Sequence, residues 1–218
     1  MTLRLPFADR TDAGRRLGER LAGSDAGGRV VVLGIPRGGV VVAAEVAAAL
    51  NAPLDVVVPR KVGAPFNPEL GLGAVASGVR VLDQRLIRDL GVPDSYLEQE
   101  IARQEREIER RLEAYRGGRP PVDVHAATAI VVDDGVATGG TAVAALRWAR
   151  AAGAGEVVLA VPVAPPQAMP MLQAEADRVV ALATPEPFHA VGQWYRDFEQ
   201  VTDRTVVAAL RASGDRSP

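Results

Sequence analysis

Two adjacent carboxylates, Asp133 and Asp134, mark the segment with the clearest chemistry. The sequence IVVDDGVATGGTA over 130–142 places them after an apolar run and before a loop of small residues. Backbone N–H groups of small residues can converge on an anion, the hydroxyls of Thr138 and Thr141 add donors, and the start of a following helix favours negative charge. The segment therefore predicts a phosphate cradle. Its members are Val136, Ala137, Thr138, Gly139, Gly140 and Thr141.

The acid pair beside this cradle indicates ribose chemistry. Two carboxylates next to a phosphate repel a second anion, but they accept hydrogen bonds from hydroxyls, such as those of a ribose whose 5′-phosphate lies in the cradle. They would also stabilise the positive charge that grows on the ribose when a group leaves its C1 atom. The alternative is a plain Asp-Asp turn that caps the helix. The loop lacks both the P-loop lysine and the GxGxxG pattern, so it indicates neither triphosphate hydrolysis nor dinucleotide binding.

A second glycine-rich turn follows another apolar run. Residues 34–39 read GIPRGG and precede a helical pattern. A strand, a glycine-rich turn and a helix again form an anion site, and the Arg37 guanidinium offers a planar fork to phosphate oxygens. We predict that Arg37, Gly38 and Gly39 bind diphosphate. A tight turn with a surface arginine is the alternative.

Two adjacent cations, Arg60 and Lys61, follow the apolar run 54–59. Lys61 is the only lysine in the chain, and a compact ammonium does not replace a planar guanidinium. We expect Lys61 first and Arg60 second to contact a leaving diphosphate, although both could be solvated loop cations. The next segment, 64–73, is rich in Pro and Gly and reads as a mobile loop that closes over the substrate and excludes water.

The elements that position these motifs alternate along the chain. Apolar runs predict strands at 29–35, 54–59, 126–132, 156–163 and 177–184. Helical patterns cover 38–50, 141–152, 166–175, 201–212 and an N-terminal stretch from Asp9 or Thr11 to Leu21, while 73–82 reads as a hairpin or two short strands. This order predicts an α/β fold, a doubly wound and mainly parallel sheet with flanking helices. Its carboxyl edge would gather the motifs.

A long charged helical insertion is predicted at 94–116. Ser95 and Glu98 have the spacing of a capping box, with Asp94 as an alternative cap. One narrow apolar stripe runs along this helix. It consists of Leu97, Ile101, Ile108, Leu112 and Tyr115. The stripe could pack on its own domain, or the helix could be a dimerisation arm or a cover over the active site.

Aromatic residues gather after the last predicted strand, although the chain is only 4% aromatic. Phe188 and Trp194 are candidates for stacking on a flat base. A small core that seals the C-terminal helix is the alternative. We expect the two histidines, His125 and His189, to be ordinary surface residues.

The amino-acid composition excludes several classes of protein. The chain of 218 residues has no cysteine, two histidines and a net charge of -2. Disulfide scaffolds, thiolate zinc sites and a global basic field for nucleic acid are excluded, and no apolar run reaches the length of a membrane span. We expect a cytoplasmic protein with one domain over 1–212, a core at 28–184, a C-terminal aromatic hood segment at 185–212 and a disordered tail at 213–218.

The segment 130–142 resembles the diphosphoribosyl-binding signature of type I phosphoribosyltransferases, a hydrophobic strand followed by D-D-x-x-x-T-G-x-T. The resemblance extends over about 28–184 and is closest to bacterial members of about this length. It implies that Asp133 and Asp134 bind ribose hydroxyls and that the cradle binds the 5′-phosphate. The R-G-G turn is similar to the diphosphate loop of xanthine and guanine phosphoribosyltransferases, and in the family this loop often has a strained or cis peptide bond beside a glycine.

The resemblance implies transfer of a 5-phosphoribosyl group from phosphoribosyl diphosphate (PRPP) to a nitrogenous base, which we expect to be a purine. Mg²⁺ would assist diphosphate release, held mostly by substrate oxygens and weakly by Asp133 and Asp134. We expect a homodimer without nucleic-acid or membrane partners. The alternative is a non-catalytic regulatory protein of the same fold that senses PRPP or nucleotides; a hydrolase using the acid pair is a weaker third hypothesis.

Overall fold

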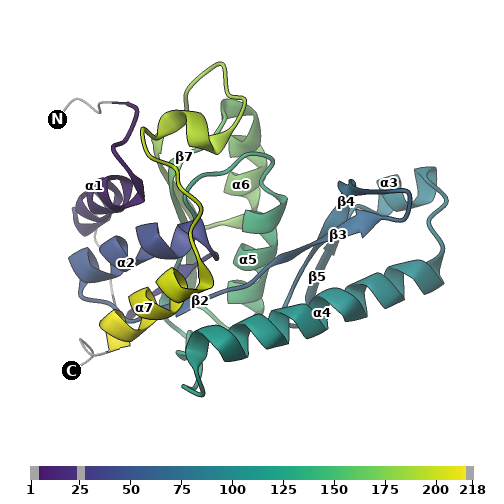
Figure 1. Cartoon of the computed structure of the whole chain (residues 1–218), viewed down its shortest axis with the longest axis horizontal. Coiled ribbons are helices and arrows are strands. Elements are labelled where there is room, and N and C mark those ends of the chain that lie inside the picture. The colour runs from purple at the N-terminus through teal and green to yellow at the C-terminus, as the bar shows by residue number, and fades with distance from the viewer. Residues whose placement is uncertain (1–4, 24–27, 215–218) are drawn as a thin grey trace.

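The computed structural model describes residues 5–23 and 28–214, and a five-stranded parallel sheet forms its centre (Figure 1). The strand order is β2-β1-β6-β7-β8, and every neighbouring pair is parallel. The bounds are Val30–Gly34 for β1, Leu54–Val56 for β2, Thr128–Val132 for β6, Glu156–Val163 for β7 and Arg178–Ala183 for β8. The predicted doubly wound α/β architecture is confirmed. Strand β2 is shorter than the predicted 54–59, because the chain leaves the sheet after Val56.

Helices cover both faces of this sheet. On one face lie α1 (Arg10–Ala22), α2 (Gly38–Leu50) and α7 (Asp203–Gly214); on the other lie α5 (Gly140–Ala151), the 3-10 turn η1 (Pro166–Ala168) and α6 (Met169–Glu175) (Figure 1). Successive strand residues point to opposite faces. Val32 and Ile130 accordingly join the core under α2, while Val31 and Val131 join the core under α5.

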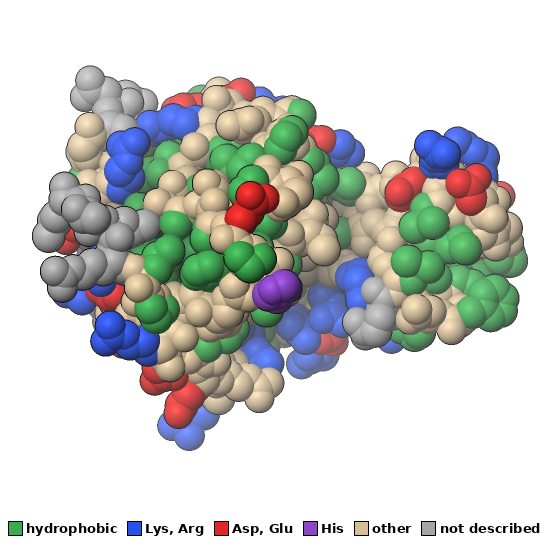
Figure 2. Space-filling model, turned by 90° about the horizontal axis from the view of Figure 1, so that it is seen from above, with side chains coloured by type: hydrophobic (Ala, Val, Ile, Leu, Met, Phe, Trp, Pro, Cys, Tyr) green, Lys and Arg blue, Asp and Glu red, His purple; other side chains and the backbone are tan. Residues whose placement is uncertain are grey.

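An arm projects from this body and forms a separate, smaller lobe (Figures 1 and 2). It consists of the antiparallel strands β3 (Arg60–Ala64), β4 (Asn67–Ala76) and β5 (Val79–Leu82), with helices α3 (Gln84–Asp89) and α4 (Asp94–Arg116). The hairpin predicted at 73–82 is present as β4 and β5. The loop predicted at 64–73 is wrong in its backbone, because these residues form the turn between β3 and β4 and most of β4. The sequence pattern also missed the short helix α3.

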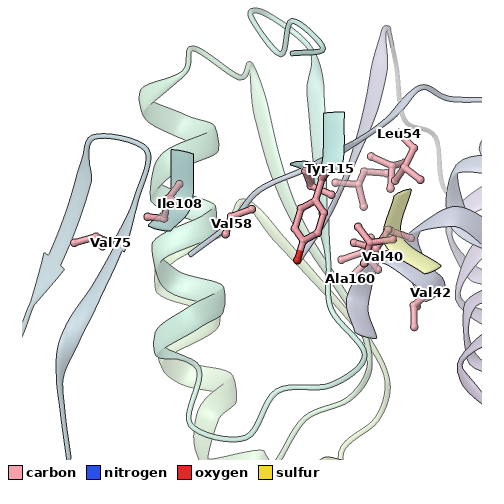
Figure 3. Close-up of a cluster of buried hydrophobic side chains, with 14 of the residues drawn as sticks. Val40, Val42, Leu54, Val58, Val75, Ile108, Tyr115 and Ala160 are labelled. Atoms are coloured by element: carbon pink, nitrogen blue, oxygen red, sulfur yellow. The ribbon is translucent and has the colours of Figure 1, made fainter. Parts of the chain in front are cut away.

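Helix α4 packs its apolar stripe on its own chain. Leu97, Ile101, Ile108 and Tyr115 are buried and belong to the same core as residues of α2, β2 and the arm strands. Figure 3 shows Ile108 and Tyr115 in this cluster with Val40 and Leu54. The predicted capping box is wrong: Pro93 occupies the N-cap and no side chain caps the helix.

The C-terminal segment folds back over the carboxyl edge of the sheet. It contains the 3-10 turn η2 (Val191–Trp194) and then α7, which continues through the buried Ser213 to Gly214. The predicted tail at 213–218 is therefore wrong for its first two residues, and 215–218 lie outside the described residues. Within the described parts of the chain, no helix is long and apolar enough to cross a membrane.

Candidate active site

The predicted phosphate cradle lies at the carboxyl end of β6. The backbone turns sharply at Gly139, whose φ of 87° lies in the left-handed region, and α5 begins at Gly140. Ala137, Thr138 and Thr141 are exposed. Among the described residues, none accepts a hydrogen bond from the N–H groups of these three residues or of Gly140. They and the helix N-terminus can therefore donate to an anion.

Val136 differs from the rest of the cradle. It is buried, and its N–H donates to the carbonyl oxygen of Val163 at 2.9 Å. This bond ties the loop to β7 and uses the donor that an anion would need. Val136 thus supports the shape of the cradle through packing.

The acid pair stands between the cradle and the neighbouring strand β1. The N–H of Asp134 donates to Oδ1 of Asp133 at 2.8 Å. Burial, and then the neighbouring Asp134 carboxylate, raise the pKa of Asp133 well above its ordinary value. Asp133 therefore holds its negative charge less readily than an exposed carboxylate would.

The turn at 36–39 packs directly against the acid pair. The Pro36–Arg37 peptide bond is cis, and α2 begins at Gly38. A Cβ atom at Gly38 would overlap the Asp134 carboxylate, and one at Gly39 would lie 2.8 Å from Oδ1 of Asp133. The structure thus brings together two motifs that the sequence separates by nearly a hundred residues, and their contact requires glycine at both positions.

Arg37 extends from this turn toward the start of α7. Its guanidinium lies 4.0 Å from the carboxylate of Asp203, and its side chain is 36% exposed. The Tyr115 hydroxyl of α4 also donates to Asp203, at 2.8 Å. Arg37 is therefore placed at the carboxyl edge with part of its donor fork open to solvent.

The structure builds Arg60 and Lys61 into the arm, which corrects the expected loop after a core strand. Arg60 begins β3 and donates from Nε to the side-chain oxygen of Gln104 on α4, at 3.0 Å. Burial, and then the nearby Arg111, lower the pKa of Arg60. Lys61 pairs with Ala74 across the antiparallel sheet and is exposed.

The aromatic residues after β8 form a small cluster of their own. The rings of Phe188 and Trp194 have centroids 6.0 Å apart, and both residues pack beside Phe7 and Tyr195. The indole Nε1 of Trp194 is buried and has no hydrogen-bond partner within the described part of the chain. These residues form a small core, as in the predicted alternative, but it packs on α1, β7 and β8 and, among the described residues, includes none of the C-terminal helix. Phe188 and Trp194 are half-buried, and stacking on a base stays a proposal. His125 and His189 are exposed, as expected.

Two residues that sequence reasoning missed contact the acid pair. Arg10 of α1 donates from Nε to Oδ2 of Asp134 at 2.7 Å, and the Tyr195 hydroxyl donates to the carbonyl oxygen of Asp134 at 2.5 Å. Burial, and then Asp134, raise the pKa of Tyr195, so the hydroxyl keeps its proton. Arg10 lies 124 residues from Asp134, and no local pattern in the sequence could reveal the contact.

The side chains of the protein could form only a weak metal site by themselves. Within residues 5–23 and 28–214, no three His, Asp or Glu side chains are grouped to hold a metal ion. Asp133 and Asp134 supply hard carboxylate oxygens, which suit Mg²⁺ when a substrate provides further oxygens. The residues therefore fit a substrate-borne Mg²⁺ and do not form a cage.

Comparison with known proteins places this architecture in a family. The model of the phosphoribosyl transferase domain matches residues 9–198. The chain is 51% identical over 205 residues to "Putative phosphoribosyl transferase Rv0571c" of Mycobacterium tuberculosis H37Rv and, with the same figures, to the corresponding protein of strain CDC 1551. The match covers 94% of this chain and 46% of these relatives, so the chain spans about half their length.

A solved structure agrees with the fold. The crystal structure of TT1426 from Thermus thermophilus superposes with a TM-score of 0.79 at 50% identity, covering 94% of this chain and 97% of that one. The purine phosphoribosyltransferase of Pyrococcus horikoshii Ot3, at 16% identity and a TM-score of 0.48 over 88% and 93% of the two chains, is too distant to indicate a substrate. The chain belongs to the phosphoribosyl transferase family.

Proposed function

We propose that the protein transfers a 5-phosphoribosyl group from PRPP to a nitrogenous base, of which a purine is our first candidate. The observation that carries this proposal is the contact between the glycine-rich turn at 36–39 and the acid pair, with the open cradle beside them. An anion site on each side of two carboxylates matches a ribose that carries a phosphate at one end and a diphosphate at the other. Family membership supports the same reaction class.

In the proposed reaction, the C1–O bond to diphosphate breaks and a C1–N bond to the base forms. The cradle donors hold the 5′-phosphate, and Asp133 and Asp134 accept hydrogen bonds from the ribose hydroxyls. Positive charge on the ribose ring is greatest when the diphosphate has begun to leave, and the nearby carboxylates stabilise it most at that stage. Diphosphate departs with the bonding electrons toward the turn that carries Arg37. The base loses its N–H proton to solvent water as the C1–N bond forms.

Mg²⁺, when bound, would neutralise charge on the departing diphosphate. Substrate oxygens would supply most of its ligands, with Asp133 and Asp134 as the protein's share. We further propose that Lys61, on the exposed side of β3, contacts the diphosphate, and that Phe188 and Trp194 border the base.

Calorimetric titration of PRPP into the protein, with Mg²⁺ and then with excess EDTA, tests this proposal. We expect binding that weakens by about tenfold or more when the metal is removed, because the diphosphate then keeps its full charge. A matched titration with ribose 5-phosphate separates the cradle from the diphosphate site. Absence of PRPP binding to the folded protein would contradict the proposal. Binding without diphosphate release, after purines and then pyrimidines are screened, would favour the regulatory alternative.

We also propose a homodimer, formed through the arm. The stripe of α4 is buried in its own chain, so it does not serve this purpose, but Phe66 at the β3–β4 turn is 93% exposed. Leu70 and Leu90 of the arm are exposed as well, and Figure 2 shows hydrophobic side chains gathered on this lobe. Such patches mark contact surfaces more often than ordinary surface. Sedimentation equilibrium should show a dimer for the wild type and a monomer for Phe66→Ser. The control Arg85→Ser, which replaces an exposed arginine of the arm, should remain a dimer. A wild-type monomer would refute the proposal.

A further inference from the structure

The guanidinium of Arg10 makes three different contacts, one of them with the acid pair. Its Nε donates to Oδ2 of Asp134 at 2.7 Å, and its NH1 donates to the carbonyl oxygen of Glu199 at 2.8 Å. Its Cζ lies over the ring of Phe198, 3.8 Å from the ring centroid. The side chains of Arg10 and Asp134 are only 11% and 16% exposed. One cation therefore links the start of α1, the end of β6 and the C-terminal segment.

The surroundings leave this guanidinium little freedom. A Cβ atom at Gly38 would lie 2.7 Å from Nε of Arg10, so the turn of the diphosphate motif closes one side. On the other side, the Phe198 ring packs against Tyr195 with centroids 5.0 Å apart, and Tyr195 donates to the backbone of Asp134. A stacked guanidinium that also donates two hydrogen bonds in fixed directions is well suited to hold a carboxylate in one orientation.

The charge of Arg10 also matters to a ligand with several phosphate groups. Asp133 and Asp134 place two carboxylates beside a site that would receive a phosphate and a diphosphate. A buried carboxylate without a partner is costly, and like charges at close range repel. Arg10 offsets one of the two acids. Since Nε uses one acceptor position of Asp134, the carboxylate keeps capacity for hydroxyl donors.

We infer that Arg10 is a positioning residue of the phosphoribosyl site: it fixes the Asp134 carboxylate for the ribose hydroxyls and fastens the C-terminal segment over it. This inference rests on the proposed function, because it takes PRPP as the ligand. Arg10 does not touch the reacting atoms in this arrangement; it acts through Asp134. Two other roles predict different results. A purely structural Arg10 would affect folding alone, and an Arg10 that blocks the site would oppose binding.

The test compares PRPP binding, in the presence of Mg²⁺, across variants of α1. Arg10→Ala should raise the Kd for PRPP by about tenfold or more, since both the orientation and the counter-charge are lost. Arg10→Lys keeps the charge without the planar fork and should recover part of this loss. Arg15→Ala is the matched control, because it removes a guanidinium of the same helix that is 63% exposed and pairs only weakly with Asp12; its Kd should stay within about twofold of wild type.

Phe198→Leu provides a second route if Arg10→Ala does not fold. It removes the ring under the guanidinium but keeps the ion pair, and we expect a smaller rise in Kd, about threefold. An unchanged Kd in both Arg10→Lys and Phe198→Leu would overturn the inference, as would wild-type affinity in a folded Arg10→Ala. Tighter binding by Arg10→Ala would overturn it too, because Arg10 would then be a block. Failure of the wild type to bind PRPP would instead refute the proposed function, and this inference with it.

Discussion

Asp134→Asn should lower kcat for phosphoribosyl transfer by about 10²–10³-fold while the protein keeps its fold. The substitution preserves the shape of the side chain and its contact with Arg10, but it removes the negative charge that faces the ribose as diphosphate leaves. PRPP affinity should change much less than kcat, because the charge matters most in the transition state. The measurement is the initial rate of diphosphate release with whichever base the screen identifies, at saturating PRPP.

The neighbouring acid gives the comparison that makes this prediction specific. The Asp133 carboxylate accepts a hydrogen bond from the N–H of Asp134 and lies against Gly39, and burial together with the Asp134 carboxylate raises its pKa, so it offers less charge to the ribose than an exposed carboxylate would. We expect Asp133→Asn to lower kcat by only about tenfold. Asp89→Asn, at an exposed carboxylate of the arm, is the control for the substitution itself. A kcat for Asp134→Asn close to the wild-type value would show that this carboxylate does not stabilise the ribosyl cation.

Gly38→Ala is the second substitution with a large expected effect. The added methyl group would overlap the Asp134 carboxylate and lie 2.7 Å from Nε of Arg10, so the acid, the arginine or the first turn of α2 must shift. Because a displacement of about 1 Å at a catalytic group can cost about 100-fold, we expect PRPP binding or turnover to fall at least that far. Circular dichroism should show the helices intact, since α2 tolerates alanine at its first position.

Gly23→Ala is the matched control for this experiment. Gly23 follows α1, its φ is -81°, and a Cβ atom there would have no neighbour closer than 3.9 Å. We expect wild-type binding and activity from this variant. If Gly38→Ala also retained them, the turn at 36–39 could not lie against the acid pair in the working protein.

The central sheet could be predicted from short-range patterns in the sequence, whereas the arm could not. Buried parallel strands appear as short apolar runs, so β1, β6, β7 and β8 were predicted to within a few residues. The segment 64–73 reads as a loop because its high proline and glycine content suggests a break in regular structure. Most of it belongs to strand β4, which pairs with the antiparallel strand β3 and, from Gly73 onward, also with β5, and the partners of a strand are not a local property.

The residues of the candidate site also fall into two groups: those that local sequence patterns predict, and those that only tertiary packing brings to the acid pair. Asp133, Asp134 and the glycines at 38 and 39 belong to strand ends that a parallel sheet must bring to one edge, so their meeting could be predicted. Arg10 and Tyr195 reach the acid pair through tertiary packing of both ends of the chain. Arg60 was expected at that edge because β2 seemed to end beside it; β2 stops earlier, and Arg60 packs on α4.

The bond between Arg10 and Glu199 has a consequence for how the protein is made. These residues are 189 positions apart, and Phe7 is likewise bridged to Tyr195. Joining such distant segments costs chain entropy, and this cost is lower once the rest of the chain has folded. We therefore expect this junction to form after the sheet and its helices. A ribosome delivers Phe7 and Arg10 long before Tyr195 and Glu199 exist. The growing chain therefore carries the acid pair, the cradle and the turn at 36–39 for some time before the segment that covers them arrives, and we expect PRPP binding to begin only after residues 195–199 have been made.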